Sequence, residues 1–543
     1  MNFKILETEQ KLRGGYYTPE ILADFINRWV LESNPKQILE PSCGDGVFFE
    51  SFFNTFRDSI MLTAFEINES ESRKAEQRFY QNNYNNFKIF NKDFLKWTVQ
   101  NFNTDAKFDA VVGNPPFIRY QYLEDDTQSL IEMIFKLLRL KFTKHTNLWV
   151  PFVLASIHFL KPQGRLGMVL PAEILHVMHA QSLRTYLGQN CERLLIFDPE
   201  DLWFTDTLQG AVVLFAEKKK EIESETKGLS IIKTKGYKFT EESPSKYISS
   251  AKYINGKTIE GKWTYALLTD VEYDLLLSLR RNKYIHQFKN IADVDVGIVT
   301  GANKYFLVND EVIKKFDLEK YSHPMFGRSE HCQGVIYDEI QHQKNISNGA
   351  PTNFIWFDID SEEELNLLQK DYLKVGKAES IHLRYKCRIR NPWFRVPSVY
   401  TTKIGMLKRA HEFPKLILND IQAYTTDTSY RIKSKYLDES SIVYSFINSL
   451  TALTAELEGR HYGGGVLELV PSEIEKLLIP IPQNLNFVSG LKKLNEEFTH
   501  KINAQEILGK QDQIILSAIG LSKEEIRVIQ SARKRLSARR RRI

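Results

Sequence analysis

The sequence predicts an α/β fold in its N-terminal part, with a doubly wound sheet of seven strands covered by helices on both faces. Seven short runs of apolar, often β-branched residues lie between residues 37 and 217, and stretches with helical spacing separate most of them. Strands that are apolar along their whole length are buried on both faces, as in the parallel sheets of α/β proteins. A second observation is the length, because 543 residues are too many for one core and indicate further domains.

The strands and helices can be placed one by one. The strand candidates are residues 37–41, 61–67, 87–94, 108–115, 165–171, 193–198 and 210–217. Glu69–Tyr80 and Trp149–Leu160 have helical spacing, and the second is expected to end before Pro162 and Gly164. The last two strands lie too close together for a full helix between them, so we expect that edge of the sheet to be antiparallel.

The composition changes along the chain and indicates three parts. Residues 218–261 are polar and charged, which is typical of a linker or a small excursion. An irregular, aromatic-rich pattern then continues to the segment LLIPIP, and amphipathic helices with a basic tail follow. We therefore predict an α/β domain at residues 1–245, a mixed α+β domain at 262–482 and a helical segment with a basic tail at 483–543.

The composition argues against several classes of protein. Charged residues make up 26% of the chain and hydrophobic residues 42%, which is ordinary for a globular protein. No apolar run approaches the roughly 20 residues that span a bilayer, and the N-terminus lacks a signal-type apolar stretch. Cys43, Cys191, Cys332 and Cys387 lie far apart, in no metal-ligand spacing. We expect a cytoplasmic protein without membrane contact, disulfides or a metal site.

Positive charge is clustered in two places. The net charge is only +5, but the segment from Ser531 to the end contains seven basic residues and no acid. Ser380–His411 contains eight Lys or Arg residues and no Asp or Glu. Such clusters usually meet phosphate, so the internal one favours contact with nucleic acid. The tail is equally compatible with a solvated, disordered extension.

Ligands of α/β sheets bind at the carboxyl ends of the strands, and the first two strands end in residues suited to this. Glu40 ends the first strand, and Gly44 and Gly46 follow it before a helix. Glycines allow a ligand to approach the backbone closely, although a plain tight turn has the same sequence. Glu66 ends the second strand, about 20 residues after the glycines, where an acid accepts hydrogen bonds from a ribose diol.

The third and fourth strand ends add groups for flat, nitrogen-rich rings. Asp93 can accept a hydrogen bond from an adenine amino group, and the ring of Phe94 can cover an adenine face. After the fourth strand, the two prolines of VVGNPPFIRY force a rigid, extended loop. That loop would fix the side-chain oxygen of Asn114 and the carbonyl of Pro115 as two acceptors beside Phe117. Two acceptors and a ring suit a planar exocyclic amine; a structural proline turn is the alternative.

Taken in order, these motifs resemble the S-adenosylmethionine-dependent N6-adenine DNA methyltransferases of type II restriction–modification systems. The motifs that carry the resemblance are YYTPEILADFI, LEPSCGDG, FDAVVGNPPF, NLWVPFVLASIHFLKPQGRLGMVLP and LWFTDTLQGAVVLF. Within that family, the order of motifs is similar to the group whose cofactor motif precedes the catalytic motif. The resemblance implies a Rossmann-like methyltransferase domain, a C-terminal target-recognition domain and C-terminal helices.

The resemblance also implies individual roles. The residues implied at the cofactor, S-adenosyl-L-methionine, are Thr18, Glu40 and Ser42 at the methionine part, Gly44, Glu66 at the ribose, Asp93 and Phe94 at the adenine, and Asn114 with Pro116. At the target base it implies Asn114 and Pro115 on the amine, with Phe117 and Phe204 stacked on the ring. Many relatives have Tyr where this chain has Phe117, but stacking needs only the ring.

The C-terminal half carries a weaker resemblance to target-recognition domains, in residues 295–308 and 461–482. Between these segments, Arg384, Lys386, Arg388 and Arg390 recur at every second position. If this stretch is a strand, the four cations lie on one face and can bind phosphates or guanine edges, while Trp393 or Phe394 packs on a sugar or base. An exposed charged strand is the alternative.

The function predicted is site-specific N6-methylation of adenine in double-stranded DNA, which protects the site from a separately encoded restriction endonuclease. The adenine would be flipped out of the duplex, at a cost of about a few kcal/mol, by a monomer that contacts DNA with both domains. Its amine would attack the sulfonium methyl in line, with catalysis by positioning and electrostatics.

Other functions remain compatible with the motifs. N4-cytosine methylation uses the same amine chemistry, although such relatives usually have Ser at the position of Asn114. RNA or protein glutamine could be the substrate, but those enzymes generally lack a second domain. A non-catalytic DNA-specificity subunit is a further alternative, against which the intact motif from Asn114 to Phe117 argues.

Overall fold

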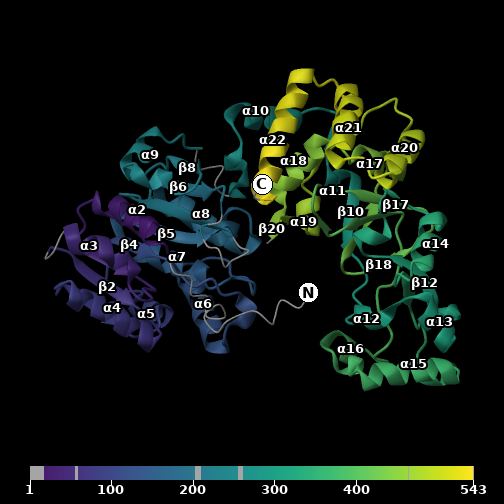
Figure 1. Ribbon diagram of the computed structural model, residues 1–543, viewed down its shortest axis with the longest axis horizontal. Coiled ribbons are helices and arrows are strands. Elements are labelled where there is room, and N and C mark those ends of the chain that lie inside the picture. Colours follow the sequence, from purple (N-terminus) through teal and green to yellow (C-terminus); the bar gives the residue numbers. More distant parts are fainter. Residues whose placement is uncertain are drawn as a thin grey trace. The chain divides into compact units, whose positions relative to one another are not determined.

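The computed structural model describes residues 18–55, 59–201, 203, 210–254, 261–462 and 464–541. The chain passes between two compact units at Leu267 and Leu268 (Figure 1). The first contains the α/β sheet and the second a mixed α+β structure followed by helices, as predicted. The boundaries of the three predicted domains remain a prediction. Among the described residues, no helix is long and apolar enough to cross a membrane.

The first unit is built on one sheet with the strand order β3-β2-β1-β4-β5-β7-β6-β8. Its strands are β1 (Gln37–Glu40), β2 (Met61–Phe65), β3 (Phe87–Phe90), β4 (Phe108–Gly113), β5 (Leu160–Pro171), β6 (Cys191–Pro199), β7 (Ala211–Lys218) and β8 (Gly228–Thr234). Strands β1 to β5 pair in parallel, whereas β7 is antiparallel to both of its neighbours, β5 and β6. All seven predicted strands are present, and the expected antiparallel pairing of the last two is confirmed; the edge itself is formed by β8, which pairs in parallel with β6.

Helices cover both faces of this sheet, because alternate strand residues point into two separate cores. Leu39 and Val111 belong to one core, and their neighbours Ile38 and Ala110 belong to the other. The helices are α2 (Glu20–Leu31), α3 (Glu50–Thr55), α4 (Glu69–Gln81), α5 (Phe94–Asn101), α6 (Asp125–Leu137), α7 (Trp149–Phe159), α8 (Gln181–Asn190) and α9 (Pro244–Ser250). Residues of α2, α3 and α4 fill one core and residues of α5 to α8 the other, which is the doubly wound arrangement.

The sequence missed one strand of the sheet. Residues 218–261, predicted as a linker or excursion, contain β8, which pairs in parallel with β6 over seven residue pairs. The strand is hard to recognise because only part of it is buried, and Lys233 is exposed. Helix α7 ends where expected, but β5 starts at once at Leu160, so Pro162 and Gly164 lie in an irregular part of β5, where the pairing with β4 jumps from Leu160 to Arg165.

The second unit has no single large sheet among its described residues. Its strands form sheets of five (β10-β19-β15-β17-β13), four (β11-β14-β12-β18), three (β16-β21-β20) and two strands (β22-β9). The strands are β9 (Ile285–Gln287), β10 (Ala292–Val296), β11 (Leu307–Val308), β12 (Ser322–Phe326), β13 (Ile336–Tyr337), β14 (Asn353–Ile355), β15 (Ile404–Leu407), β16 (Arg409–Ala410), β17 (Leu416–Asn419), β18 (Tyr424–Thr425), β19 (Ser429–Ser434), β20 (Arg460–Tyr462), β21 (Val466–Glu468) and β22 (Leu478–Pro480).

Helices complete the second unit and pack on these sheets. They are α10 (Asp270–Leu279), α11 (Phe288–Ile291), α12 (Asn303–Phe306), α13 (Asp310–Phe316), α14 (Glu339–Ser347), α15 (Leu367–Ala378), α16 (Tyr385–Arg388), α17 (Glu439–Ser445), α18 (Ser449–Glu458), α19 (Pro471–Ile474), α20 (Phe487–Thr499), α21 (Ala504–Ala518) and α22 (Lys523–Arg541). The three C-terminal helices, yellow in Figure 1, contact one another and also α17 and α18.

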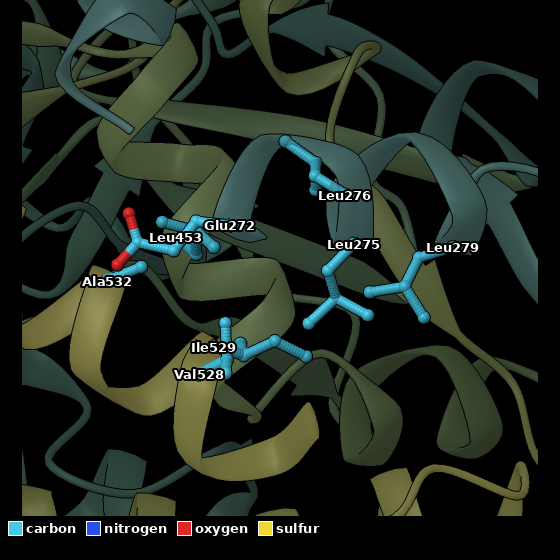
Figure 2. Close-up of a pocket in the computed structure, with 8 residues that line it drawn as sticks. All are labelled: Glu272, Leu275, Leu276, Leu279, Leu453, Val528, Ile529 and Ala532. Carbon is cyan, nitrogen blue, oxygen red and sulfur yellow. The ribbon is translucent and has the colours of Figure 1, made fainter. Parts of the chain in front are cut away.

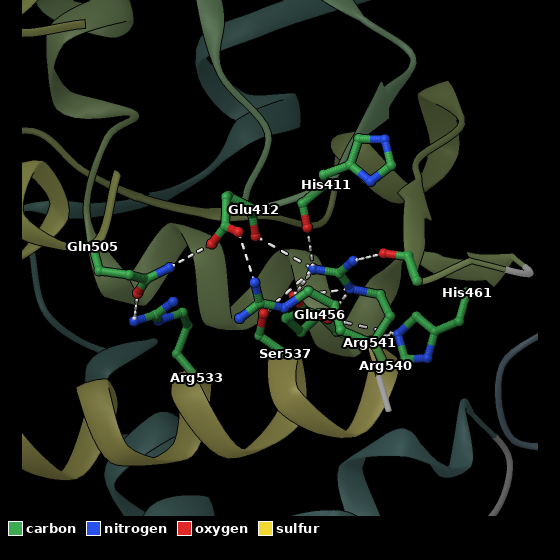
Figure 3. Close-up of polar contacts among 10 residues, drawn as sticks. His411, Glu412, Glu456, His461, Gln505, Arg533, Ser537, Arg540 and Arg541 are labelled. Atoms are coloured by element: carbon green, nitrogen blue, oxygen red, sulfur yellow. Dashed lines mark hydrogen bonds and ion pairs between the residues drawn. The ribbon is translucent and has the colours of Figure 1, made fainter. Parts of the chain in front are cut away.

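The basic tail is part of this packing. Its residues up to Arg541 continue helix α22, so the disordered extension considered above is wrong for the described residues. The side chain of Arg540 is fully buried, and its Nη2 lies 2.8 Å from Oε1 of the buried Glu456 (Figure 3). Arg540 also donates to the backbone carbonyls of Gly465 and His411, while Arg541 pairs with Glu412 at 2.6 Å. These arginines stabilise the fold from within.

A pocket of the second unit lies beside the same helix (Figure 2). It is lined by Glu272, Leu275, Leu276, Leu279, Leu453, Val528, Ile529 and Ala532. Glu272 is the charged residue of this set, and its carboxylate accepts hydrogen bonds of 2.6 and 2.5 Å from Arg535. An apolar hollow whose carboxylate is already paired is a packing seam between α10 and α22, and it offers no group for chemistry.

Candidate active site

The loop after β1 leaves space beside its backbone. Gly44 has φ +53°, and a Cβ placed there would have no atom within 4 Å. Gly46 has φ +88°, and its Cβ would lie only 2.7 Å from the ring of Phe49. Side chains rarely adopt such φ values, so both positions favour glycine. Asp45, between them, is held by an ion pair of 2.8 Å with Arg78 of α4. The open side of Gly44 is therefore available to a ligand.

Glu66 joins the ends of β1 and β2. Its Oε2 accepts a hydrogen bond of 2.9 Å from the amide of Gly44, and its Oε1 accepts one of 2.8 Å from the amide of Asn68. The side chain of Asn91, after β3, donates to the carbonyls of Glu66 and Ile67 at 2.9 and 3.1 Å. These bonds fix the predicted ribose carboxylate at the common edge of three strands.

The side chain of Glu40 is buried without a full set of partners. The residue is 2% exposed, and its Oε2 has no hydrogen-bond partner among the described residues. Burial, together with the negative charges of Asp45 and Glu66, raises the pKa of Glu40 well above its ordinary value. Burial also raises the pKa of Glu66, against the opposing effect of its two amide bonds. Two neighbouring carboxylates in this state favour a ligand that brings positive charge or hydroxyl donors.

Thr18 is a second buried polar residue with an unused atom. It is 4% exposed, and its Oγ1 has no hydrogen-bond partner among the described residues. Thr18 lies just before α2, a helix that packs against β4, β5 and the short helix at Val47–Phe49. Buried hydroxyls are normally hydrogen-bonded, so Thr18 also indicates a polar ligand.

The third strand end is more structural than the sequence indicates. Asp93 caps α5, and its Oδ1 accepts hydrogen bonds from the amides of Leu95 and Lys96 at 2.7 and 3.4 Å. Phe94 is 2% exposed and packs against Phe65 and Phe152 in the core. By contrast, Ile67 is 72% exposed directly beside Glu66. An exposed apolar side chain at a strand end can cover a flat ring, a role that the sequence analysis did not assign to it.

The loop from Asn114 to Arg119 follows β4 and contacts the first strand end. Pro115 is buried, while Asn114, Pro116 and Phe117 are half-buried. The hydroxyl of Ser42 donates a hydrogen bond of 3.1 Å to the backbone carbonyl of Asn114. The predicted cofactor loop and the predicted catalytic loop are thus connected directly.

A polar cluster that the sequence analysis missed supports the other end of this loop. The amide of Leu148 donates to the carbonyl of Ile118 at 2.9 Å, and the amide of Tyr120 donates to Oδ1 of Asn147 at 3.4 Å. Asn147 and Trp149 in turn both donate to Oε1 of Glu173, at 2.8 and 3.0 Å. Glu173 follows β5, so the next strand end braces the loop.

Glu173 remains an acceptor because its neighbours favour the charged form. Burial alone would raise the pKa of Glu173, but His179, whose Nε2 lies 3.8 Å away, and the donors Asn147 and Trp149 lower that pKa below its ordinary value. A pattern of acidic residue after a strand could have pointed to Glu173, but its partners come from a different segment. Phe204, the predicted second stacking ring, lies outside the described residues.

In the second unit, the strand expected over Arg384–Arg390 is wrong. Residues 381–383 form a 3-10 turn and Tyr385–Arg388 form α16, with the amide of Arg388 donating to the carbonyl of Arg384 at 2.9 Å. Alternate residues of a helical turn point in different directions, so the four cations do not form the single row that a strand would give them. The segment follows α15 closely and pairs with no strand in the described part of the chain.

The predicted DNA-contacting residues have different environments in this segment. Arg390 donates to the carbonyls of Thr300 and Val299 at 2.9 and 2.6 Å. Trp393 is half-buried and packs near Tyr305, with 5.6 Å between ring centroids, while Phe394 is fully buried. Arg384, Lys386 and Arg388 are exposed.

Comparison with known proteins covers nearly the whole chain. The sequence pattern of the N-6 DNA methylases matches residues 4–253, and that of the C-terminal domain of type II methyltransferase M.Eco57I matches residues 260–516. The chain is 24% identical over 523 residues to type II methyltransferase M.AccI of Acinetobacter calcoaceticus, with 92% of each chain covered. It is 22% identical over 610 residues to M.BstVI of Geobacillus stearothermophilus, with 97% of this chain and all of that one covered.

Proposed function

The chain belongs to the N-6 DNA methylases with an M.Eco57I-type C-terminal domain, and from this premise we propose how its strand-end residues act. As a type II DNA methyltransferase of the N6-adenine family, it is proposed to transfer a methyl group from S-adenosyl-L-methionine to a flipped-out adenine in duplex DNA. The observation that carries the assignment of the site is the hydrogen bond between Ser42 and Asn114, which joins the two loops that would hold the reactants.

The residues present fit the cofactor. Glu40 and Thr18 each have a buried oxygen that no other described residue pairs with, and S-adenosyl-L-methionine offers an ammonium group and a sulfonium charge. Both oxygens of Glu66 accept one amide bond each and keep lone pairs for a ribose diol. Ile67 would cover the adenine of the cofactor, and Asp93 would contact it with the oxygen not used for capping. The open space at Gly44 admits the ligand beside the backbone.

Asn114 and Pro115 would accept the two N–H groups of the target amine. When bound, S-adenosyl-L-methionine would supply a methyl group from its sulfonium, and the amine nitrogen that accepts the methyl group would release a proton to water. The acceptors stabilise the positive charge that develops on the amine nitrogen, and the rigid proline loop keeps them in place. Phe117, and Phe204 by the resemblance, would hold the ring of the flipped base.

We further propose the biological setting of a restriction–modification system. The chain would methylate its recognition sites in the host's own DNA as a monomer, and a separately encoded restriction endonuclease would then not cleave those sites. The relatives M.AccI and M.BstVI support this setting, because both are named as type II methyltransferases.

The reaction can be tested in a bacterial host that lacks DNA methylation. The chain is expressed there, and genomic DNA is read by single-molecule sequencing that detects modified bases. The proposal predicts N6-methyladenine at one position of a short recurring sequence. N4-methylcytosine at such a site would leave the assigned site unchanged but would show that the target base is cytosine and not adenine. If the cells contain soluble protein that binds S-adenosylmethionine but their DNA is unmodified, the proposal that DNA is the substrate would be overturned.

A further inference from the structure

Within the basic stretch Ser380–His411, only part of the positive charge is available to a ligand. Arg395 pairs with Asp358 and Asp360, and Lys408 and Arg409 pair with Glu468. Lys403 lies 3.9 Å from Glu439, and Arg390 is used by two backbone carbonyls. Arg384, Lys386 and Arg388 differ from these five. All three are exposed, and none makes an ion pair or a side-chain hydrogen bond with another described residue.

The three unpaired cations alternate with exposed apolar side chains. Leu383 is 61% exposed, Tyr385 62% and Ile389 62%. The charged groups of Lys386 and Arg388 lie 5.5 and 5.6 Å from the centroid of the Tyr385 ring. Exposure of large apolar side chains to water costs free energy, so three such side chains within seven residues indicate a contact surface. We call residues 383–389 the α16 ridge.

The α16 ridge is held rigidly from below. Ile381 and Cys387 are buried in a core of the second unit, and Arg390 is tied to the loop at Thr300. That loop packs tightly, because a Cβ at Gly301 would lie 2.7 Å from the Cβ of Lys386. The inward residues thus fix the backbone, so the backbone of the ridge need not become ordered on binding. Such preorganisation lowers the entropic cost of a contact.

We propose that the α16 ridge is a DNA-contacting element in which Arg384, Lys386 and Arg388 bind backbone phosphates and Tyr385 packs into a groove against sugars or bases. Duplex DNA is the occupant that fits, because phosphates complement three free cations and sugar and base faces complement an exposed ring. The inference rests on the proposed function, since it assumes that this methyltransferase binds duplex DNA. The inference narrows the predicted DNA contact from the whole basic stretch to residues 383–389. It also adds Tyr385, which was not among the DNA-contacting residues predicted from the sequence.

The charge contribution is tested by the salt dependence of binding to duplex DNA that contains the methylated site. The triple variant Arg384→Ala, Lys386→Ala, Arg388→Ala should bind DNA more weakly than wild type. The slope of log K against log salt should become shallower by about 2 to 3, because each phosphate contact contributes about 0.9 to its magnitude. The matched control removes the exposed Lys492, Lys493 and Lys523 of the same unit, which have no ion-pair partner among the described residues. Equal slopes for the triple variant and this control would overturn the phosphate contacts.

The aromatic contribution is tested with Tyr385→Ala against Tyr436→Ala. Tyr436 is a matched control because it is 64% exposed in the same unit. Tyr385→Ala should bind about tenfold more weakly with an unchanged salt slope, and Tyr385→Phe should bind like wild type, because only the ring packs. If Tyr385→Ala behaves like Tyr436→Ala, the groove contact is wrong.

Two further readouts separate this inference from the proposed function. Every variant must keep the thermal transition and the S-adenosylmethionine affinity of wild type, because the ridge lies outside the first unit. Wild type that neither binds nor methylates DNA would contradict the proposed function itself. If ridge variants bind and methylate DNA normally but lose binding to anionic phosphatidylserine vesicles, the ridge binds a membrane surface and not DNA. That result would overturn the inference about the ridge and leave the proposed function intact.

Discussion

The hydroxyl of Ser42 donates a hydrogen bond of 3.1 Å to the backbone carbonyl of Asn114, across the ends of two adjacent parallel strands. The two residues are 72 positions apart in the sequence, and each begins a loop with its own role in the proposed reaction. Their contact means that the position of the target amine depends on the loop that would hold the methyl donor.

Replacement of Ser42 should therefore affect turnover more than binding. Ser42→Ala removes one hydrogen bond, whose net contribution is about 0.5–1.5 kcal/mol, so kcat should fall by up to about tenfold. Ser42→Thr keeps the hydroxyl and should recover most of the rate. Steady-state kinetics with DNA and S-adenosylmethionine varied separately measures the effect. A change confined to the KM for DNA would contradict a link between the two loops.

Glu40 should give the affinity for S-adenosylmethionine an unusual pH dependence. The cationic cofactor favours the ionised carboxylate, and the pKa of Glu40 is raised by burial and by the charges of Asp45 and Glu66. The affinity should therefore fall as the pH is lowered, starting at a higher pH than an ordinary Glu would cause. Calorimetric titration across pH measures this fall. Glu40→Gln should bind weakly at every pH, and an unchanged pH profile in that variant would assign the effect to another group.

The same residue should cost stability when no ligand is bound. A carboxyl whose pKa is higher in the folded than in the unfolded chain destabilises the fold above its unfolded pKa, because the unfolded chain releases its proton first. Glu40→Gln removes that cost, about 1.4 kcal/mol for each pH unit between the two pKa values. The ligand-free variant should melt higher than wild type at about pH 8 and equally at about pH 4. A lower melting temperature at alkaline pH would show that Glu40 is stabilising as it stands.

Glu173 should act as a positioning residue for the loop that contains Asn114. Glu173→Ala leaves Asn147 and Trp149 without their shared acceptor, so kcat should fall while the affinities for DNA and S-adenosylmethionine change little. Glu173→Gln keeps a carbonyl oxygen that both donors can reach and should restore most of kcat. Single-turnover methylation rates distinguish the two variants. Equal loss of rate in both would mean that the charge of Glu173, rather than its hydrogen bonds, is required.

Arg540 should be essential for stability rather than for DNA binding. Arg540→Ala removes the arginine partner of the buried Glu456, and breaking such a buried pair typically costs about 3–5 kcal/mol. The melting temperature of the second unit should fall by about 10 °C. Lys534→Ala, at an exposed position of the same helix, is the matched control and should have little effect. Weaker DNA binding by a fully stable Arg540→Ala would contradict the structural role.

The sequence was sufficient to predict the structure where one segment contains both the apolar pattern of a strand and a polar residue at the end of that strand. Apolar runs predicted seven strands, and Glu40, Glu66 and Asn114 could be placed at their ends because parallel strands share one carboxyl edge. The sequence was insufficient where a partner comes from far along the chain. β8 is a strand because β6 pairs with it, and Glu173 is a support because Asn147 and Trp149 reach it.

Charge patterns were the least informative part of the sequence. A run of arginines looks the same whether its partners are phosphates or buried carboxylates, and only the fold shows that Glu456 and Glu412 meet Arg540 and Arg541. The alternation from Arg384 to Arg390 likewise has the period of a strand, but its local hydrogen bonds make a helical turn. The composition predicted where basic residues are concentrated in the sequence. The fold determines which of these residues pair with carboxylates and which are available to a ligand.

In the proposed reaction, Asn114 holds the adenine amine during methyl transfer. The most direct test treats duplex DNA with wild type or Asn114→Ala and S-adenosylmethionine, and then quantifies modified nucleosides by mass spectrometry. Wild type should produce N6-methyladenine, and the variant should lose about 100-fold or more of this activity while it binds both ligands at near wild-type affinity. Methylation by Asn114→Ala at the wild-type rate would show that Asn114 does not hold the amine.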